Sequence, residues 1–176
     1  MEGQKAKASK FVLNYGLILG LIMVVLGVVM YVLDYHLQPH WSLTVLSSIL
    51  FILVVIYGIK AFKKANGGFL SLGEGIKVAV GIALIAAILT GVWTVLLSTV
   101  IEPGLTEQAI EIEREKAFEM NPNMTDEQWE KGLEMTEVFR QPWFSFTAIL
   151  IMYMLFGLIV GLIAGAVMKQ KRPYDV

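Results

Sequence analysis

Four long runs of apolar residues alternate with polar segments along the chain. These runs carry no charged residue and cover residues 11–33, 41–59, 78–101 and 143–168. A helix of roughly 20 apolar residues crosses the hydrocarbon core of a bilayer. Because a helix also satisfies its own backbone hydrogen bonds there, the pattern predicts an all-α integral membrane protein. We expect a single membrane domain over residues 1–176, with four transmembrane helices.

Charged residues are segregated between the segments that flank these runs. Ten of the 14 basic residues lie before the first run, between the second and third, or after the fourth: Lys5, Lys7, Lys10, Lys60, Lys63, Lys64, Lys77, Lys169, Lys171 and Arg172. Residues 102–140 instead hold 11 of the 15 acidic residues and only four basic ones. Because basic loops stay on the cytoplasmic side of a membrane, we predict that both termini are cytoplasmic.

The acidic segment 102–142 then lies on the outer side. It is longer than most connections between helices, and its composition predicts an extracytoplasmic acidic helical hairpin. The stretches 106–120 and 125–139 are expected to be helical, with a break at Asn121-Pro122-Asn123.

The second of these predicted helices carries a candidate docking surface. Thr125 and Gln128 have the spacing of a capping box, which predicts the helix start. Trp129, Leu133 and Phe139 form a narrow apolar stripe. One interpretation is a docking surface for a basic or membrane-bound partner. The alternative is a solvated cap whose stripe packs on the bundle.

Small residues collect in the predicted inner halves of the runs. The glycines expected to take part in helix packing are Gly16, Gly20, Gly157, Gly161 and Gly165. Residues four apart share one helix face, and small residues let membrane helices approach closely. We expect an intrachain contact between the first and fourth runs, with a homodimer face as the alternative.

Hydroxyl side chains show the opposite asymmetry and collect in the outer halves. These hydroxyl residues, together with one tryptophan, predict an outward-facing cleft. Its lining residues would be Ser47, Ser48, Thr90, Trp93, Thr94, Ser98 and Thr147. The alternative is that these hydroxyls bond to backbone carbonyls one turn back in their own helices. The sequence leaves both interpretations open.

No residue cluster indicates a reaction. The chain has no cysteine, and the interiors of the four runs have no ionisable residue of the kind that transporters use. His36 and His40 have a ligand spacing only in a helix, which Pro39 disfavours. We therefore expect no enzyme activity, no cofactor, no metal site and no nucleic-acid binding.

Three segments carry a resemblance to a known family. They are "GGFLSLGE" (residues 67–74), the loop from Glu102-Pro103 through "NPNMTDEQWEKGLEM" to Pro142, and the glycine-rich fourth run. The chain resembles the Bacteroidota-type four-span membrane proteins called domain of unknown function 4199. The resemblance implies a multi-pass protein of the inner membrane of a Gram-negative cell, and it supplies no catalytic residues. It also suggests a polyprenyl-phosphate glycosyltransferase as a membrane partner.

Two functions are consistent with these features. The first is a non-catalytic accessory or assembly protein of the cell envelope that packs with a membrane partner. The second is a lipid- or amphiphile-binding protein that uses the hydroxyl-lined cleft. The expected contacts are membrane lipids and a membrane protein, with a second copy of the chain as the alternative protein contact.

Overall fold

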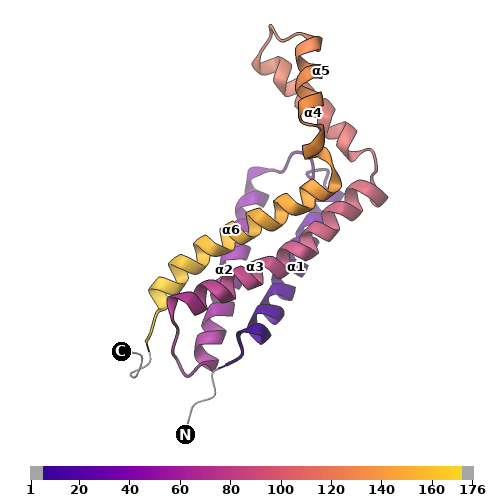
Figure 1. Cartoon of the computed structure of the whole chain (residues 1–176). Helices are drawn as coiled ribbons and strands as arrows, with labels where there is room; N and C mark the ends of the chain where they lie inside the picture. Colours follow the sequence, from indigo (N-terminus) through magenta and orange to yellow (C-terminus); the bar gives the residue numbers. More distant parts are fainter. Residues whose placement is uncertain (1–5, 172–176) are drawn as a thin grey trace. The chain divides into compact units, whose positions relative to one another are not determined.

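The computed structural model describes residues 6–171 and is built of helices. They are α1 (Ala8–Val32), α2 (Trp41–Ala65), α3 (Leu72–Leu96), the π-helical turn η1 (Leu97–Ile101), α4 (Leu105–Met120), α5 (Asp126–Met135), the 3₁₀ turn η2 (Glu137–Arg140) and α6 (Pro142–Met168) (Figure 1). Four helical segments are long and apolar enough to cross a membrane: Ala8–Val32, Trp41–Ala65, Leu72–Ile101 and Pro142–Met168. The predicted all-α class and the four membrane-type helices are confirmed.

The connection between α2 and α3 explains why the helices stop and start where they do. Gly67 and Gly68 adopt φ angles of +73° and +85° and so end α2. Residues that have a Cβ rarely adopt such positive φ angles. Ser71 and Glu74 then form a capping box. The Ser71 backbone N–H donates to Glu74 Oε2 at 2.8 Å, and the Glu74 N–H donates to Ser71 Oγ at 3.2 Å.

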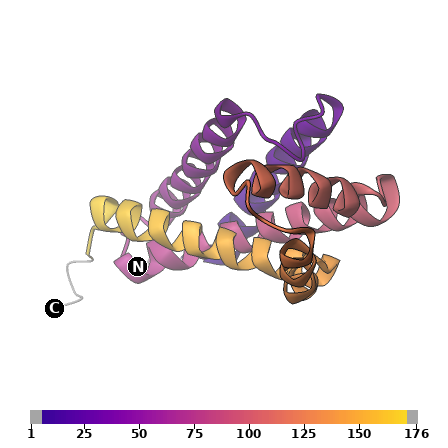
Figure 2. The same cartoon turned by 90° about the horizontal axis from the view of Figure 1, so that it is seen from above.

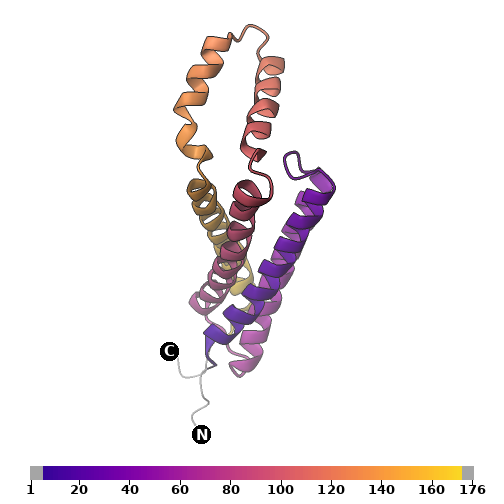
Figure 3. The same cartoon turned by 90° about the vertical axis from the view of Figure 1, so that its right-hand side faces the viewer.

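The chain forms two compact units. The first contains the residues up to Thr90 and those from Ile149 onward. Its core gathers side chains from four helices, with Leu19 of α1, Val55 of α2 and Val160 of α6 among them. Within this unit, α3 runs alongside α6 and α1 (Figures 2 and 3), and α2 contacts α6 directly through the rings of Phe51 and Phe156, whose centroids are 4.8 Å apart. The α3 residues that are fully buried are Val78, Ala79, Ile82, Ala83, Ala86 and Ala87.

Both ends of the described chain meet the α2–α3 connection. The Ala6 N–H donates to Asn66 Oδ1 at 3.3 Å. Leu70 and Gln170 form an isolated antiparallel bridge. Lys63 Nζ donates to the Met168 carbonyl at 2.9 Å. This bond satisfies one of the carbonyls left open at the end of α6.

The second unit, Gly91–Ala148, contains the end of α3, the beginning of α6 and everything between them. Gly91 packs against the ring of Phe146, where an added Cβ would lie 2.6 Å from Cδ2. Phe144 contacts the rings of Phe139 and Trp143. These aromatic contacts fix the beginning of α6 within this unit.

Candidate functional site

The glycines of α1 and α6 lie at helix contacts, but the predicted contact between the two sets is wrong. A Cβ on Gly157 would lie 2.6 Å from the Cβ of Ala83, and one on Gly161 would lie 2.7 Å from the Cβ of Ala79. Gly165 faces Leu72 and Gly75, also of α3. The α6 glycines therefore pack against α3.

The α1 glycines face the same central helix. An added Cβ on Gly16 would lie 2.7 Å from the Cβ of Ile85, and one on Gly20 would meet Leu89. The physical reason is that α3 carries its own small residues opposite the α6 glycines. Gly75, Ala79 and Ala83 recur every four positions, so its backbone approaches α6 closely. That spacing was the sequence signal for the true partner.

The seven residues expected in an outer cleft divide between the two units. Ser47, Ser48 and Thr90 belong to the first, whereas Trp93, Thr94, Ser98 and Thr147 belong to the second. In the first unit, Ser47 and Ser48 border a pocket of about 270 Å³. The other lining residues are Met23, Phe51, Met152, Tyr153 and Phe156.

Most of these hydroxyls bond to carbonyls of their own helices. Ser47 Oγ and Ser48 Oγ both donate to the Thr44 carbonyl at 2.9 Å. Ser98 Oγ donates to Val95 O at 3.3 Å, and Thr147 Oγ1 donates to Trp143 O at 2.8 Å. This is the second of the two interpretations of the hydroxyl asymmetry. Each serine in the pocket wall keeps only its acceptor lone pairs for a ligand.

The two histidines do not form a ligand pair on one helix. His40 is the N-cap of α2, and its Nδ1 accepts from the Ser42 N–H at 3.4 Å. His36 lies in the connection before it, beside the ring of Tyr31. Within residues 6–171, no three side chains of metal-ligating type lie close enough to hold an ion.

A groove of about 560 Å³ lies in the second unit, between α4, α5 and the beginning of α6. Its apolar floor includes Ile110, Leu133 and Pro142. Three carboxylates line it as well, from Glu130, Glu134 and Glu137. None of them forms an ion pair within the described part of the chain. The groove therefore combines apolar surface with three carboxylates and a single basic residue, Arg140.

Arg140 braces this groove from within. Its Nη1 donates to the Leu133 carbonyl at 2.9 Å, and its Nη2 lies 3.5 Å from Glu113 Oε2. The side chain is only 21% exposed and so connects η2 with both α5 and α4. Its charge is thus shared with Glu113 and the carbonyl rather than with the three groove carboxylates.

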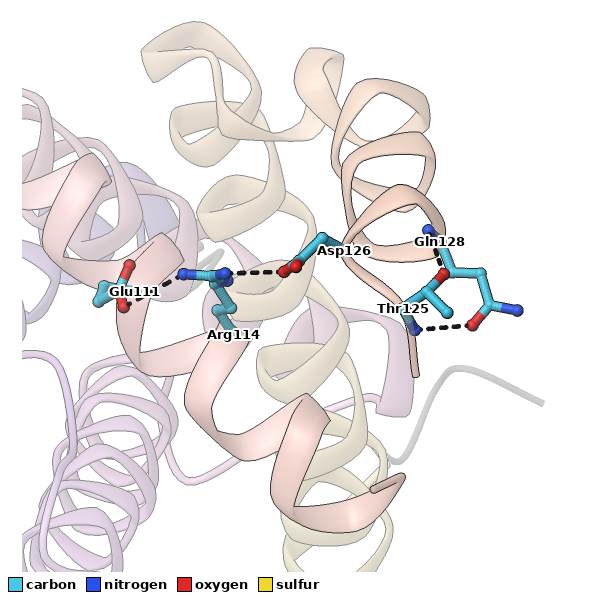
Figure 4. Close-up of polar contacts among 5 residues, drawn as sticks. All are labelled: Glu111, Arg114, Thr125, Asp126 and Gln128. Carbon is cyan, nitrogen blue, oxygen red and sulfur yellow. Dashed lines mark hydrogen bonds and ion pairs between the residues drawn. The ribbon is translucent and has the colours of Figure 1, made fainter. Parts of the chain in front are cut away.

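A second arginine joins α4 to the first turn of α5 (Figure 4). Arg114 Nη2 donates to Asp126 Oδ1 at 2.9 Å, and Glu111 lies 3.8 Å away on the other side. The hydrogen bond to Asp126 raises the pKa of the Arg114 guanidinium, which stays charged. The adjacent Thr125–Gln128 capping box, predicted from the sequence, is confirmed.

The residues expected to form the docking stripe do not lie on one helix. Leu133 lines the groove, whereas Trp129 is half-buried outside its lining. Phe139 belongs to η2, because α5 ends at Met135 rather than continuing to 139 as predicted. Its ring contacts Phe144 instead, with centroids 4.9 Å apart.

Sequence reasoning missed the three acidic residues and Ile110. The signal was available in the spacing, since Glu130, Glu134 and Glu137 recur at intervals of four and three beside Leu133. Residues at such spacings share one face of a continuous helix, and Glu137 lines the groove from η2 although α5 ends before it. The uniform acidity of the whole segment concealed this local grouping.

Residues 14–170 match the family model described as "Protein of unknown function (DUF4199)". The chain belongs to this family. The DUF4199 match includes most of both compact units and of all four membrane-type helices. No curated protein and no solved structure matches the chain significantly. Membership in DUF4199 therefore assigns no substrate and no reaction.

Proposed function

We propose that this chain is a non-catalytic membrane accessory protein that holds a basic segment of a membrane partner in the acidic groove. The carrying observation is the groove itself, in which Glu130, Glu134 and Glu137 border an apolar floor. Like charges four residues apart on a helix repel each other. A cationic occupant would relieve that repulsion while covering Ile110 and Leu133.

The surrounding charge supports a basic partner. Residues 102–140 hold 11 acidic and four basic side chains, a formal charge of 4 − 11 = −7. Such a field attracts basic segments and raises the rate of association. Exposed apolar residues near the groove, among them Met135 at 82% and Phe139 at 55%, enlarge the surface available for contact.

We also propose an orientation and a location. The lysine-rich ends of the four helices face the cytoplasm, and α4 and α5 form an acidic hairpin on the outer side of a bacterial inner membrane. The charge segregation along the sequence supports this arrangement. A membrane enzyme of envelope synthesis, such as a polyprenyl-phosphate glycosyltransferase, is one partner of the required kind.

Purification in mild detergent tests the proposal. The tagged full-length chain is compared with the triple variant Glu130→Gln, Glu134→Gln, Glu137→Gln. We expect the wild type to retain a stoichiometric membrane protein and the variant to bind it roughly tenfold more weakly, because three exposed charge contacts are lost.

A second triple variant controls for net charge. Glu107→Gln, Glu115→Gln, Glu119→Gln removes three exposed carboxylates of α4 that do not line the groove. This variant should retain the partner. Equal loss from both variants would reject a specific docking groove, and the absence of any stoichiometric protein would reject the accessory role.

The alternative function, binding of a lipid or amphiphile, has one observation in its favour. The pocket beside Ser47 and Ser48 is walled by Phe51, Tyr153 and Phe156. These aromatic side chains suit an apolar chain. If the pocket is the functional site, Ser48→Leu should expel a co-purified amphiphile, whereas Ser42→Leu outside the pocket should not.

A further inference from the structure

A groove of about 480 Å³ lies between the beginnings of α1 and α3, within the first unit. Its lining residues are Lys7, Ala8, Ser9, Val12, Lys77 and Gly81. The two helices come close because Gly81 has no side chain: a Cβ there would lie 2.8 Å from Val12 Cγ1. Ala8, Val12 and Gly81 therefore give the groove an apolar floor.

The mouth of this groove carries two basic side chains from different helices. Lys7 and Lys77 are both exposed, and within residues 6–171 neither ammonium group forms an ion pair. The Glu74 carboxylate, in the first turn of α3, is hydrogen-bonded to Ser71 instead of to either lysine. Glu74 Oε2 accepts from the Ser71 N–H at 2.8 Å and from Ser71 Oγ at 2.9 Å. Two lysines that form no ion pair with the described residues thus line the same groove, and Ser9 lines it as well.

The helices that form the groove also indicate what covers it. Both α1 and α3 are apolar enough to cross a bilayer. The α1 surface continues from the groove as exposed apolar residues, including Leu13 at 52% and Leu21 at 60%. A membrane helix with such a surface contacts lipid. Lys7 precedes α1 and Lys77 lies in the second turn of α3, so both are near helix ends, which is where the headgroup regions of a bilayer flank a spanning helix.

We propose that the Lys7–Lys77 groove binds the phosphate of an anionic phospholipid from the surrounding bilayer. Basic pockets between transmembrane helices bind anionic headgroups in this way. Lys7 and Lys77 contact the phosphate, Ser9 donates a hydrogen bond, and the first acyl carbons lie over Val12 and Gly81. This site is separate from the acidic groove and does not depend on the accessory function.

Native mass spectrometry of the full-length protein tests the site. The probes are phosphatidylglycerol and phosphatidylcholine with identical acyl chains. The wild type should retain phosphatidylglycerol preferentially. Lys7→Gln with Lys77→Gln should reduce that preference roughly 30-fold, because each lysine near the headgroups contributes about fivefold. Lys7→Arg with Lys77→Arg should restore most of it.

Matched controls separate this site from general surface charge. Lys10→Gln with Lys64→Gln removes two exposed lysines outside the groove and should leave the preference unchanged. Equal loss in both double variants, or equal retention of phosphatidylcholine by the wild type, would overturn the proposal. Displacement of the lipid by millimolar inorganic phosphate would instead assign a small-anion site. The triple variant of the acidic groove should retain phosphatidylglycerol normally, so the two proposals fail independently.

Discussion

At the residue scale, the absence of a side chain decides how closely the helices of the first unit approach. Gly157 and Gly161 meet Ala83 and Ala79 at distances that leave no room for a methyl group. Glycine is unfavourable in a helix in water, but close packing in a membrane compensates for it. The glycines of α6 are therefore part of an intrachain contact with α3.

Replacement of Gly161 by Ala should destabilise the folded monomer by about 1–3 kcal/mol, because the interface has no room for the added methyl group. The new Cβ would lie 2.7 Å from the Cβ of Ala79 and 3.1 Å from the Cα of Ile76. Titration with SDS from mixed micelles measures the change. Gly73→Ala is the control, since nothing lies within 4 Å of that Cβ position, and it should not destabilise the protein. A fully stable Gly161→Ala monomer that only fails to dimerise would support the homodimer alternative instead.

The glycine spacing showed which face of each helix is packed but not which neighbour packs on it. Periodicity is a property of one helix, whereas the choice of partner depends on the complementary face. For Gly161 that face is Ala79 and Ile76 of α3, and the four-residue spacing of Gly75, Ala79 and Ala83 indicates it only when the small residues of α3 and α6 are compared as a pair. The Lys7–Lys77 groove was missed for the same reason, since its two lysines are 70 positions apart.

At the element scale, local hydrogen bonds set the helix boundaries. The capping boxes at Ser71 and Thr125 were predictable because each depends on residues three apart. The predicted end of α5, at residue 139, lies beyond its observed end at Met135. The Thr136 N–H donates to Leu133 O at 3.2 Å. This is a 3₁₀-type bond, which tightens the last turn of a helix. Arg140 also donates to the Leu133 carbonyl. This donor is too far along the sequence for a local pattern to predict the contact.

The capping box of α5 provides a local test. Thr125→Ala should weaken the helix by about 1 kcal/mol, because the Gln128 N–H loses its acceptor. Hydrogen exchange of the amides in residues 126–129 should accelerate accordingly. Thr125→Ser keeps the hydroxyl and should exchange as the wild type does. Equal exchange in all three proteins would show that the cap has no role.

Arg140 provides the corresponding test for the groove. Arg140→Gln removes the contacts to Leu133 and Glu113, so amides of residues 133–141 should exchange roughly tenfold faster. Arg114→Gln is the matched comparison, because its contact is with Asp126 at the other end of α5. That variant should affect the beginning of α5 and leave residues 133–141 unchanged. The same exchange pattern in both variants would argue against a specific brace at Arg140.

At the scale of the whole molecule, the distribution of charge connects the fold with the proposed function. Four membrane-type helices separate a lysine-rich set of segments from the acidic residues 102–140 along the sequence. The accessory role needs the acidic groove on the outer side, and the proposed phospholipid site lies among the lysines. The first of these requirements depends on the proposed positive-inside orientation. That orientation is the claim on which the account depends most.

Cysteine labelling tests this orientation directly, because the chain has no native cysteine. Met135→Cys and Lys64→Cys each place one thiol at an exposed position, the first beside the acidic groove and the second in the lysine-rich region. Sealed spheroplasts are treated with a membrane-impermeant maleimide. The account predicts that Met135→Cys reacts at once and that Lys64→Cys reacts only after the membrane is lysed. Reaction of Lys64→Cys in sealed spheroplasts, with Met135→Cys protected, would contradict it.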